Sequence, residues 1–138
     1  MSHNSISKES WLSMEEQATK RAKEPAVPIG EVVTQLSEMI GPKFVAYTTS
    51  VTEPYVIQDW ISGKTIPPRD AEDRLRLTYQ VSKIVYDRFH DRDTLQAWLQ
   101  GKNPDLNDRS AAVMIRIAED PSKLEFELIS AAHTFASK

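Results

Sequence analysis

Apolar residues recur along most of the chain at intervals of three and four positions, the spacing of helices with one buried face. In the first part of the chain this spacing predicts helices over residues 29–40, 43–49, 53–61 and 69–89. In the last part it predicts helices over residues 92–99, 110–119 and 122–135. Residues 123–128 alternate briefly, but their continuation Ile129-Ser130-Ala131-Ala132 favours a helix. The pattern therefore predicts an all-α fold.

Prolines and glycines fall mainly between these segments, where they interrupt helices. Residues 24–28 carry two prolines and are typical of a linker, because a residue that precedes proline is driven out of the helical region. We divide the chain into an N-terminal arm (1–27), a region of short helices (28–68) and a second helical region (69–138). The thin apolar stripe of residues 10–23 fits either a packed helix or a loosely docked arm.

Composition excludes several classes of protein. The chain has 138 residues, a net charge of −3 and no cysteine, which rules out disulfides, cysteine-based zinc sites and cysteine nucleophiles. No apolar run approaches the roughly 20 residues of a membrane span. The start Met-Ser-His-Asn-Ser lacks the apolar core of a signal peptide. We expect a cytoplasmic protein that does not contact a membrane.

The sequence offers no set of residues that points to catalysis. His3, His90 and His133 lack the i, i+4 spacing of a helical metal site. The run His90-Asp91-Arg92-Asp93 is typical of a solvated helix boundary, because consecutive residues of a helix point in different directions. Neither a Gly-rich phosphate loop nor a Gly-x-Ser-x-Gly elbow is present. We expect a binding module, not an enzyme, with no metal, no cofactor and no catalytic residue.

Residues 45–67 resemble the helix-turn-helix of the Xre/Cro class. The matching features are a short helix with a small residue, a turn, and then an aliphatic residue, Trp and Gly at fixed spacing. They read Ala46, Ser50-Val51-Thr52 and Ile57-Gln58-Asp59-Trp60-Ile61-Ser62-Gly63. We expect Ile57 and Trp60 to clamp the second helix against the first, and Gly63 to allow a left-handed exit.

This resemblance implies a recognition helix over residues 53–61 that enters the major groove of operator DNA. The candidate DNA contacts are the polar residues Thr52, Tyr55, Gln58, Lys64 and Arg69. Glu53 and Asp59 lie near the same face and repel phosphates, so we expect weak, salt-sensitive DNA binding. The alternative is that these helices are kept as a scaffold with little or no affinity for DNA.

Residues 74–115 carry a second ordered set of motifs. In chain order they are Arg74-Leu75, Tyr79-Gln80-Val81, Ala97-Trp98-Leu99, Asn103-Pro104-Asp105-Leu106, Arg109-Ser110 and Val113-Met114-Ile115. The set resembles the toxin-binding domain of antitoxins of the Xre/MbcA/ParS group, and the whole resemblance spans about residues 29–132. It implies an Xre-like helix-turn-helix bundle followed by a small helical toxin-binding domain. It also implies a cognate toxin, usually a RES-domain enzyme that consumes NAD⁺, whose active site the C-terminal region covers.

We separate residues that shape the fold from residues that contact the toxin. The expected structural residues are Trp60, Gly63, Trp98, Leu99, Asn103, Pro104 and Leu106, since large apolar residues at helical spacing are usually core. The expected toxin contacts lie in the last helix and the tail, at His133, Thr134, Phe135, Ser137 and Lys138. Nothing in the sequence obviously anchors this tail, and simple fraying of the end is the alternative.

Three functions stay open on these observations. The first is an antitoxin that blocks its toxin and also represses its own operon. The second is a stand-alone helix-turn-helix regulator that uses the second region to dimerise, and the third is an interaction protein with a decayed helix-turn-helix. We expect a homodimer or a hetero-oligomer with the toxin, because helix-turn-helix proteins usually pair over two half-sites.

Overall fold

A computed structural model describes residues 26–138, so the helix or arm expected over residues 10–23 lies outside the described residues. Residues 26–138 form seven α-helices, two short 3-10 turns and no β-strand, which confirms the predicted all-α fold. The helices are α3 (Ile29–Ile40), α4 (Pro42–Thr49), α5 (Pro54–Ser62), α6 (Arg69–Phe89), α7 (Arg92–Gln100), α8 (Ala111–Ile117) and α9 (Glu125–Ala136). The 3-10 turns are η1 (Pro104–Leu106) and η2 (Pro121–Leu124).

Side-chain caps fix the helix boundaries that follow α6. At the start of α7, the N–H of Thr94 donates to the Asp91 carboxylate over 3.2 Å. At the start of α8, the N–H of Val113 donates to Ser110 Oγ over 3.3 Å. Each cap satisfies one of the backbone N–H groups that the first turn of a helix leaves free.

The starts of α4, α5 and α8 each differ by one residue from those predicted, and the start of α9 differs by three. The capping position of α5 is Glu53 and not Thr52, and it makes no side-chain hydrogen bond, so the fixed φ of Pro54 starts this helix instead. The sequence also predicts a helix from residue 122. Pro121 and the Asp120 cap form a 3-10 turn there, and α9 begins only at Glu125.

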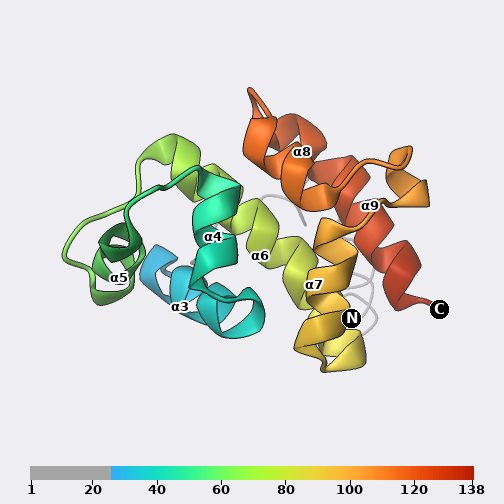
Figure 1. The fold of residues 1–138 in the computed structure, drawn as a ribbon, viewed down its shortest axis with the longest axis horizontal. Coiled ribbons are helices and arrows are strands. Elements are labelled where there is room, and N and C mark those ends of the chain that lie inside the picture. The colour runs from blue at the N-terminus through green and yellow to red at the C-terminus, as the bar shows by residue number, and fades with distance from the viewer. Residues whose placement is uncertain (1–25) are drawn as a thin grey trace, which may run out of the picture.

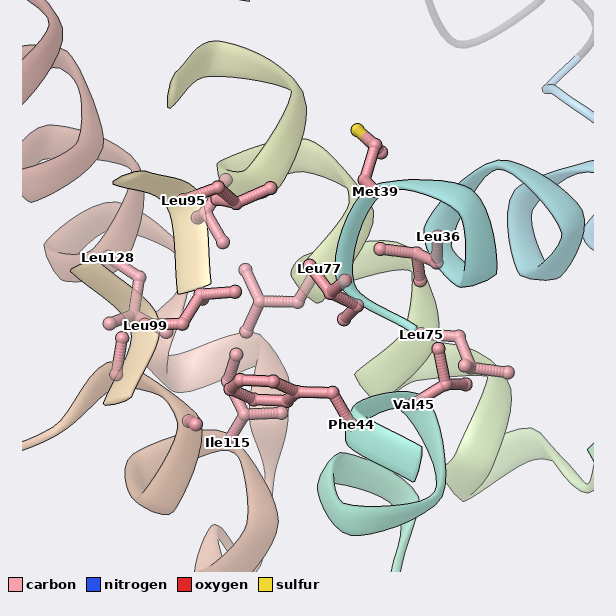
Figure 2. Close-up of a cluster of buried hydrophobic side chains, with 14 of the residues drawn as sticks. Leu36, Met39, Phe44, Val45, Leu75, Leu77, Leu95, Leu99, Ile115 and Leu128 are labelled. Carbon is pink, nitrogen blue, oxygen red and sulfur yellow. The ribbon is translucent and has the colours of Figure 1, made fainter. Parts of the chain in front are cut away.

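The long helix α6 runs through the middle of the molecule and carries the core of both helical regions (Figure 1). It contacts α3 and α4 of the first region and α7, α8 and α9 of the second. Figure 2 shows Leu77 of α6 between Leu36 on one side and Leu99 on the other. Residues 28–68 and 69–138 therefore share one continuous apolar core.

Two large apolar side chains near the C-terminal end of the chain point to solvent. Phe126 of α9 is 85% exposed, and Ile117 at the end of α8 is 72% exposed. The buried row of α9 consists of Leu128, Ala131 and Ala132. Phe126 lies two positions before Leu128, and two positions turn a helix by about 200°, so its ring faces away from α6.

Arg74 is a buried cation of α6, with 8% of its surface exposed. Its Nη1 donates to the carbonyl oxygens of Ile115 and Arg116, and its Nη2 donates to that of Ala118 over 2.5 Å. Nε and Nη2 also donate to the two carboxylate oxygens of Asp70, at 3.0 Å each. Because a helix leaves its last carbonyls without partners, this guanidinium satisfies the end of α8 and fixes it to α6.

Replacing Arg74 with Met should lower the free energy of unfolding by about 3 kcal/mol, because buried carbonyls and a carboxylate lose their donor. Urea denaturation followed by circular dichroism measures this loss. The matched control is Lys83→Met, which removes an exposed ion pair of α6 with Asp87 (3.2 Å, side chains 51% and 60% exposed). That pair should contribute less than about 0.5 kcal/mol. Equal losses in the two variants would contradict the role given to Arg74.

Candidate functional site

A pocket of about 410 Å³ opens near the C-terminal end of the chain. Three segments form it, namely α7, the turn that follows α7, and the end of α9, which lie together at one side of Figure 1. The lining residues are Thr94, Ala97, Trp98, Lys102, Asn103, Pro104, Asp105, Phe135 and Lys138. The pocket therefore brings together predicted structural residues (Trp98, Asn103, Pro104) and predicted toxin contacts (Phe135, Lys138).

Aromatic rings build the apolar wall of this pocket. The ring centroids of Trp98 and Phe135 lie 6.2 Å apart, and Phe89 of α6 lies 5.0 Å from Phe135 on centroids. Tilted pairs of this kind contribute about 0.5–1.5 kcal/mol beyond the burial of their surface. Trp98 is 7% exposed, so most of its indole belongs to the core, as predicted, and a small part lines the pocket.

Asn103 organises the turn between α7 and α8. Its Oδ1 accepts a hydrogen bond from the N–H of Asp105 over 3.0 Å. Its carbonyl oxygen accepts from the N–H groups of Leu106 (2.9 Å) and Asp108 (2.8 Å). Asn107 and Asp108 both have positive φ (57° and 62°), a conformation that Asn and Asp tolerate better than most residues. The turn folds Leu106 back into the core, which confirms its predicted burial (0% exposed).

The end of α9 is fixed to the rest of the molecule, and the expectation of an unanchored tail is wrong. Phe135 packs against Phe89 and Trp98, and Arg88 Nη2 donates to the carbonyl oxygen of Lys138 over 3.0 Å. Lys138 Nζ lies 6.0 Å from the centroid of the Phe135 ring. Phe89, Arg88 and Trp98 belong to α6 and α7, so the local sequence of the tail does not indicate these contacts.

The remaining predicted toxin contacts lie outside the pocket. His133, Thr134 and Ser137 are exposed, and none of them lines it. Ser137 Oγ donates to the carbonyl oxygen of His133 over 2.8 Å, which closes the last turn of α9. Leu99, like Leu106, is fully buried, so it supports the pocket from inside and does not face a partner.

The charged edge of the pocket is mainly cationic. Among the lining residues, Lys102 and Lys138 have cationic side chains and Asp105 has an acidic one. The hydroxyl and the N–H of Thr94 donate to Asp91 and hold the pKa of that carboxyl below its ordinary value, so this side of Thr94 is already engaged. An aromatic wall with two lysines suits a large apolar side chain that has an acidic neighbour.

The second helix of the predicted helix-turn-helix, α5, lies at the opposite end of the molecule from this pocket (Figure 1). The predicted burial of Ile57 (2% exposed) and Trp60 (4% exposed) is confirmed. Gly63 has a φ of 82° and ends α5, which confirms the predicted left-handed exit. The turn before α5 places a non-glycine residue, Ser50, in the left-handed region at a φ of 60°.

The structure exposes every predicted DNA contact. Thr52 and Gln58 are exposed, and Tyr55 of the same helix face is 63% exposed. Lys64 and Arg69 are exposed beyond the end of α5. Arg69 Nε lies 3.7 Å from Asp73 Oδ1, so one of the two cations already has an acidic neighbour.

Sequence reasoning missed two residues that matter for this architecture. The sequence places Arg74 in the Arg74-Leu75 motif, but its contacts with the end of α8 depend on the tertiary fold and have no local signal. Lys102 follows Gly101 in a polar turn, where apolar periodicity carries no information. The one sequence feature that could have indicated a functional role for Lys102 is its position directly before the Asn103-Pro104 motif.

Comparison with protein-family models, with curated proteins and with solved structures found no match to this chain. Within residues 26–138, no group of three or more His, Asp or Glu side chains is placed to hold a metal ion. None of the helices in that part of the chain is long and apolar enough to cross a membrane.

A chain that ends at Ala132 should lose about 2 kcal/mol of unfolding free energy, because the truncation removes the Phe135 ring from Phe89 and Trp98. Urea denaturation of the two chains gives the difference. Lys138→Ala is the control for the loss of the lysine charge. Its free energy of unfolding should stay within about 0.5 kcal/mol of that of the full chain. An undiminished stability of the truncated chain would mean that the tail is not anchored.

Proposed function

We propose that this chain is the antitoxin of a type II toxin–antitoxin pair, and that it binds its partner enzyme with the pocket beside Trp98 and the end of α9. One observation carries the proposal. Residues from two separate parts of the chain, the Asn103-Pro104 turn and the end of α9, line the same pocket. The first belongs to the motif set that resembles a toxin-binding domain, and the second is the region that this resemblance assigns to the toxin.

In this proposal the chain acts in the cytoplasm by steric exclusion and performs no chemistry. Aromatic pockets commonly hold the side chains that dominate a protein interface. A volume of about 410 Å³ accommodates one large side chain of the partner. Lys102 and Lys138 attract an acidic group beside that side chain, and the exposed His133 and Thr134 extend the contact. The partner that the resemblance favours is a RES-type enzyme that consumes NAD⁺.

Charge reversal at both lysines, Lys102→Glu with Lys138→Glu, should weaken toxin binding at least about tenfold, because the edge of the pocket becomes acidic. Both residues are exposed, so the melting temperature should change little. The readouts are growth and NAD⁺ content of cells that co-express the chain with the enzyme encoded by the neighbouring gene, and calorimetry of the purified pair.

The matched control is Lys123→Glu, an exposed residue of η2 just before the N-terminal end of α9. This variant should protect cells fully. Full protection by the double variant would move the inhibitory surface away from this pocket. A neighbouring gene that encodes no NAD⁺-consuming enzyme would contradict the expected partner.

Operator binding is a second candidate function, favoured by the exposed face of α5. Tyr55 and Gln58 lie one helical turn apart on this face, with Thr52 just before the helix. Gln side chains can read adenine through paired hydrogen bonds in the major groove. We propose that the chain represses its own operon in addition to neutralising the toxin. A stand-alone regulator would use the α5 face without a toxin partner.

Neutralising the two acids near this face, Glu53→Gln with Asp59→Asn, should raise non-specific DNA affinity several-fold, because each acid repels phosphates. Fluorescence anisotropy at two salt concentrations measures the effect. The control is Glu119→Gln with Glu125→Gln. It changes the net charge by the same amount, at exposed sites that are distant in sequence from α5. Tight operator binding by the unmodified chain at physiological salt would contradict the expected weak affinity.

A further inference from the structure

A second opening, of about 440 Å³, lies between the two helical regions, and we call it the α4–α8 groove. Residues of α3, α4, α7 and α8 line it, among them Ile40, Phe44, Tyr47 and Val113. Figure 2 shows Phe44 projecting from α4 towards Ile115 of α8. The groove is therefore an open depression over the shared core, and not part of either surface described above.

The groove combines an apolar surface with cations. Tyr47 and Val113 are each 39% exposed along it, and Ile117 follows one turn after Val113 on α8. Lys43 lines the groove, and the Arg116 guanidinium lies 4.5 Å from the centroid of the Tyr47 ring. Arg116 Nη1 also donates to the carbonyl oxygen of Tyr47 over 2.8 Å. No lining residue is acidic, so the groove suits an apolar group with acidic neighbours.

The start of α9 presents this complementary chemistry. Phe126 is 85% exposed and stands between Glu125 and Glu127. Glu119 and Asp120 precede it, and Lys123 is the one cation in residues 119–127. Glu127 is partly neutralised, because Arg109 Nη2 lies 2.6 Å from its carboxylate. Glu125 is exposed and makes no ion pair among the described residues, which leaves it available to a cation of a partner.

We propose that two copies of this chain pair by inserting Phe126 of each copy into the α4–α8 groove of the other. Glu125 then approaches Lys43 and Arg116 of the second copy, so that unlike charges meet around a buried ring. The Phe126 ring of the same chain is exposed on α9 and does not line its own groove. A twofold arrangement uses both grooves and both rings, and closes the assembly as a dimer. This inference does not depend on the proposed toxin or on DNA.

Cysteine cross-linking tests the contact directly, because the chain has no cysteine of its own. Two full-length variants, Val113→Cys and Phe126→Cys, are mixed under mild oxidation. The mixture should give a disulfide-linked heterodimer, while each variant alone should give little. The control mixture pairs Ile66→Cys, at an exposed site outside the groove (76% exposed), with Phe126→Cys. Equal yields from the two mixtures would overturn the proposal.

Sedimentation of the full chain supplies the second test. The unmodified protein should be a dimer. Phe126→Ser and Lys43→Glu should each weaken the dimer about tenfold. Adding Glu125→Lys to Lys43→Glu should restore the dimer, because the charge pair is then formed with the signs exchanged. A chain that stays monomeric, or a dimer that tolerates Phe126→Ser, would overturn the proposal. A dimer lost on Trp11→Ser with Leu12→Ser, but kept on Phe126→Ser, would assign the groove to the N-terminal segment instead.

Discussion

The buried guanidinium of Arg74 connects the central helix to the end of α8, and the arrangement of the second region depends on this connection. A buried charge is tolerated only when its donors are satisfied, and Arg74 reaches Asp70 and the carbonyls of Ile115, Arg116 and Ala118 in a single geometry. With its end fixed in this way, α8 places Ser110, whose Oγ donates to the carbonyl oxygen of Leu99 over 3.0 Å. The α4–α8 groove is lined by α8, which this contact holds, and the pocket beside Trp98 is lined by α7, which Ser110 contacts through Leu99.

The shared core places two candidate surfaces on opposite ends of one rigid helix. α6 has 21 residues, which corresponds to a length of about 30 Å. The exposed face of α5 lies at one end of the molecule and the pocket beside Trp98 at the other (Figure 1). In the proposed function, operator DNA and a toxin would therefore not compete for space on the same chain. The groove between the regions leaves a third surface for pairing of two copies.

Local rules predicted the elements well, and tertiary contacts caused the errors. The periodicity of residues 69–89 predicts the bounds of α6 as they are observed, and Ser110 caps α8 as a serine before an aliphatic run should. The expectation of an unanchored tail after Ala132 fails, because Phe135 packs against Phe89 of α6 and Trp98 of α7, and the spacing of residues within α9 does not encode these contacts. The hydrogen bonds of Arg74 to the carbonyls at the end of α8 join residues 41 to 44 positions apart, a separation at which sequence patterns give no geometry.

In the proposed function, a protein partner binds the pocket formed by α7, the Asn103 turn and the end of α9. Hydrogen exchange of the full chain, alone and with the enzyme encoded beside it, detects this binding residue by residue. We expect slower exchange in residues 94–105 and 133–138 on binding, with residues 52–58 unchanged. Protection confined to residues 52–58, or a complex that leaves residues 94–105 and 133–138 unprotected, would contradict the proposed binding.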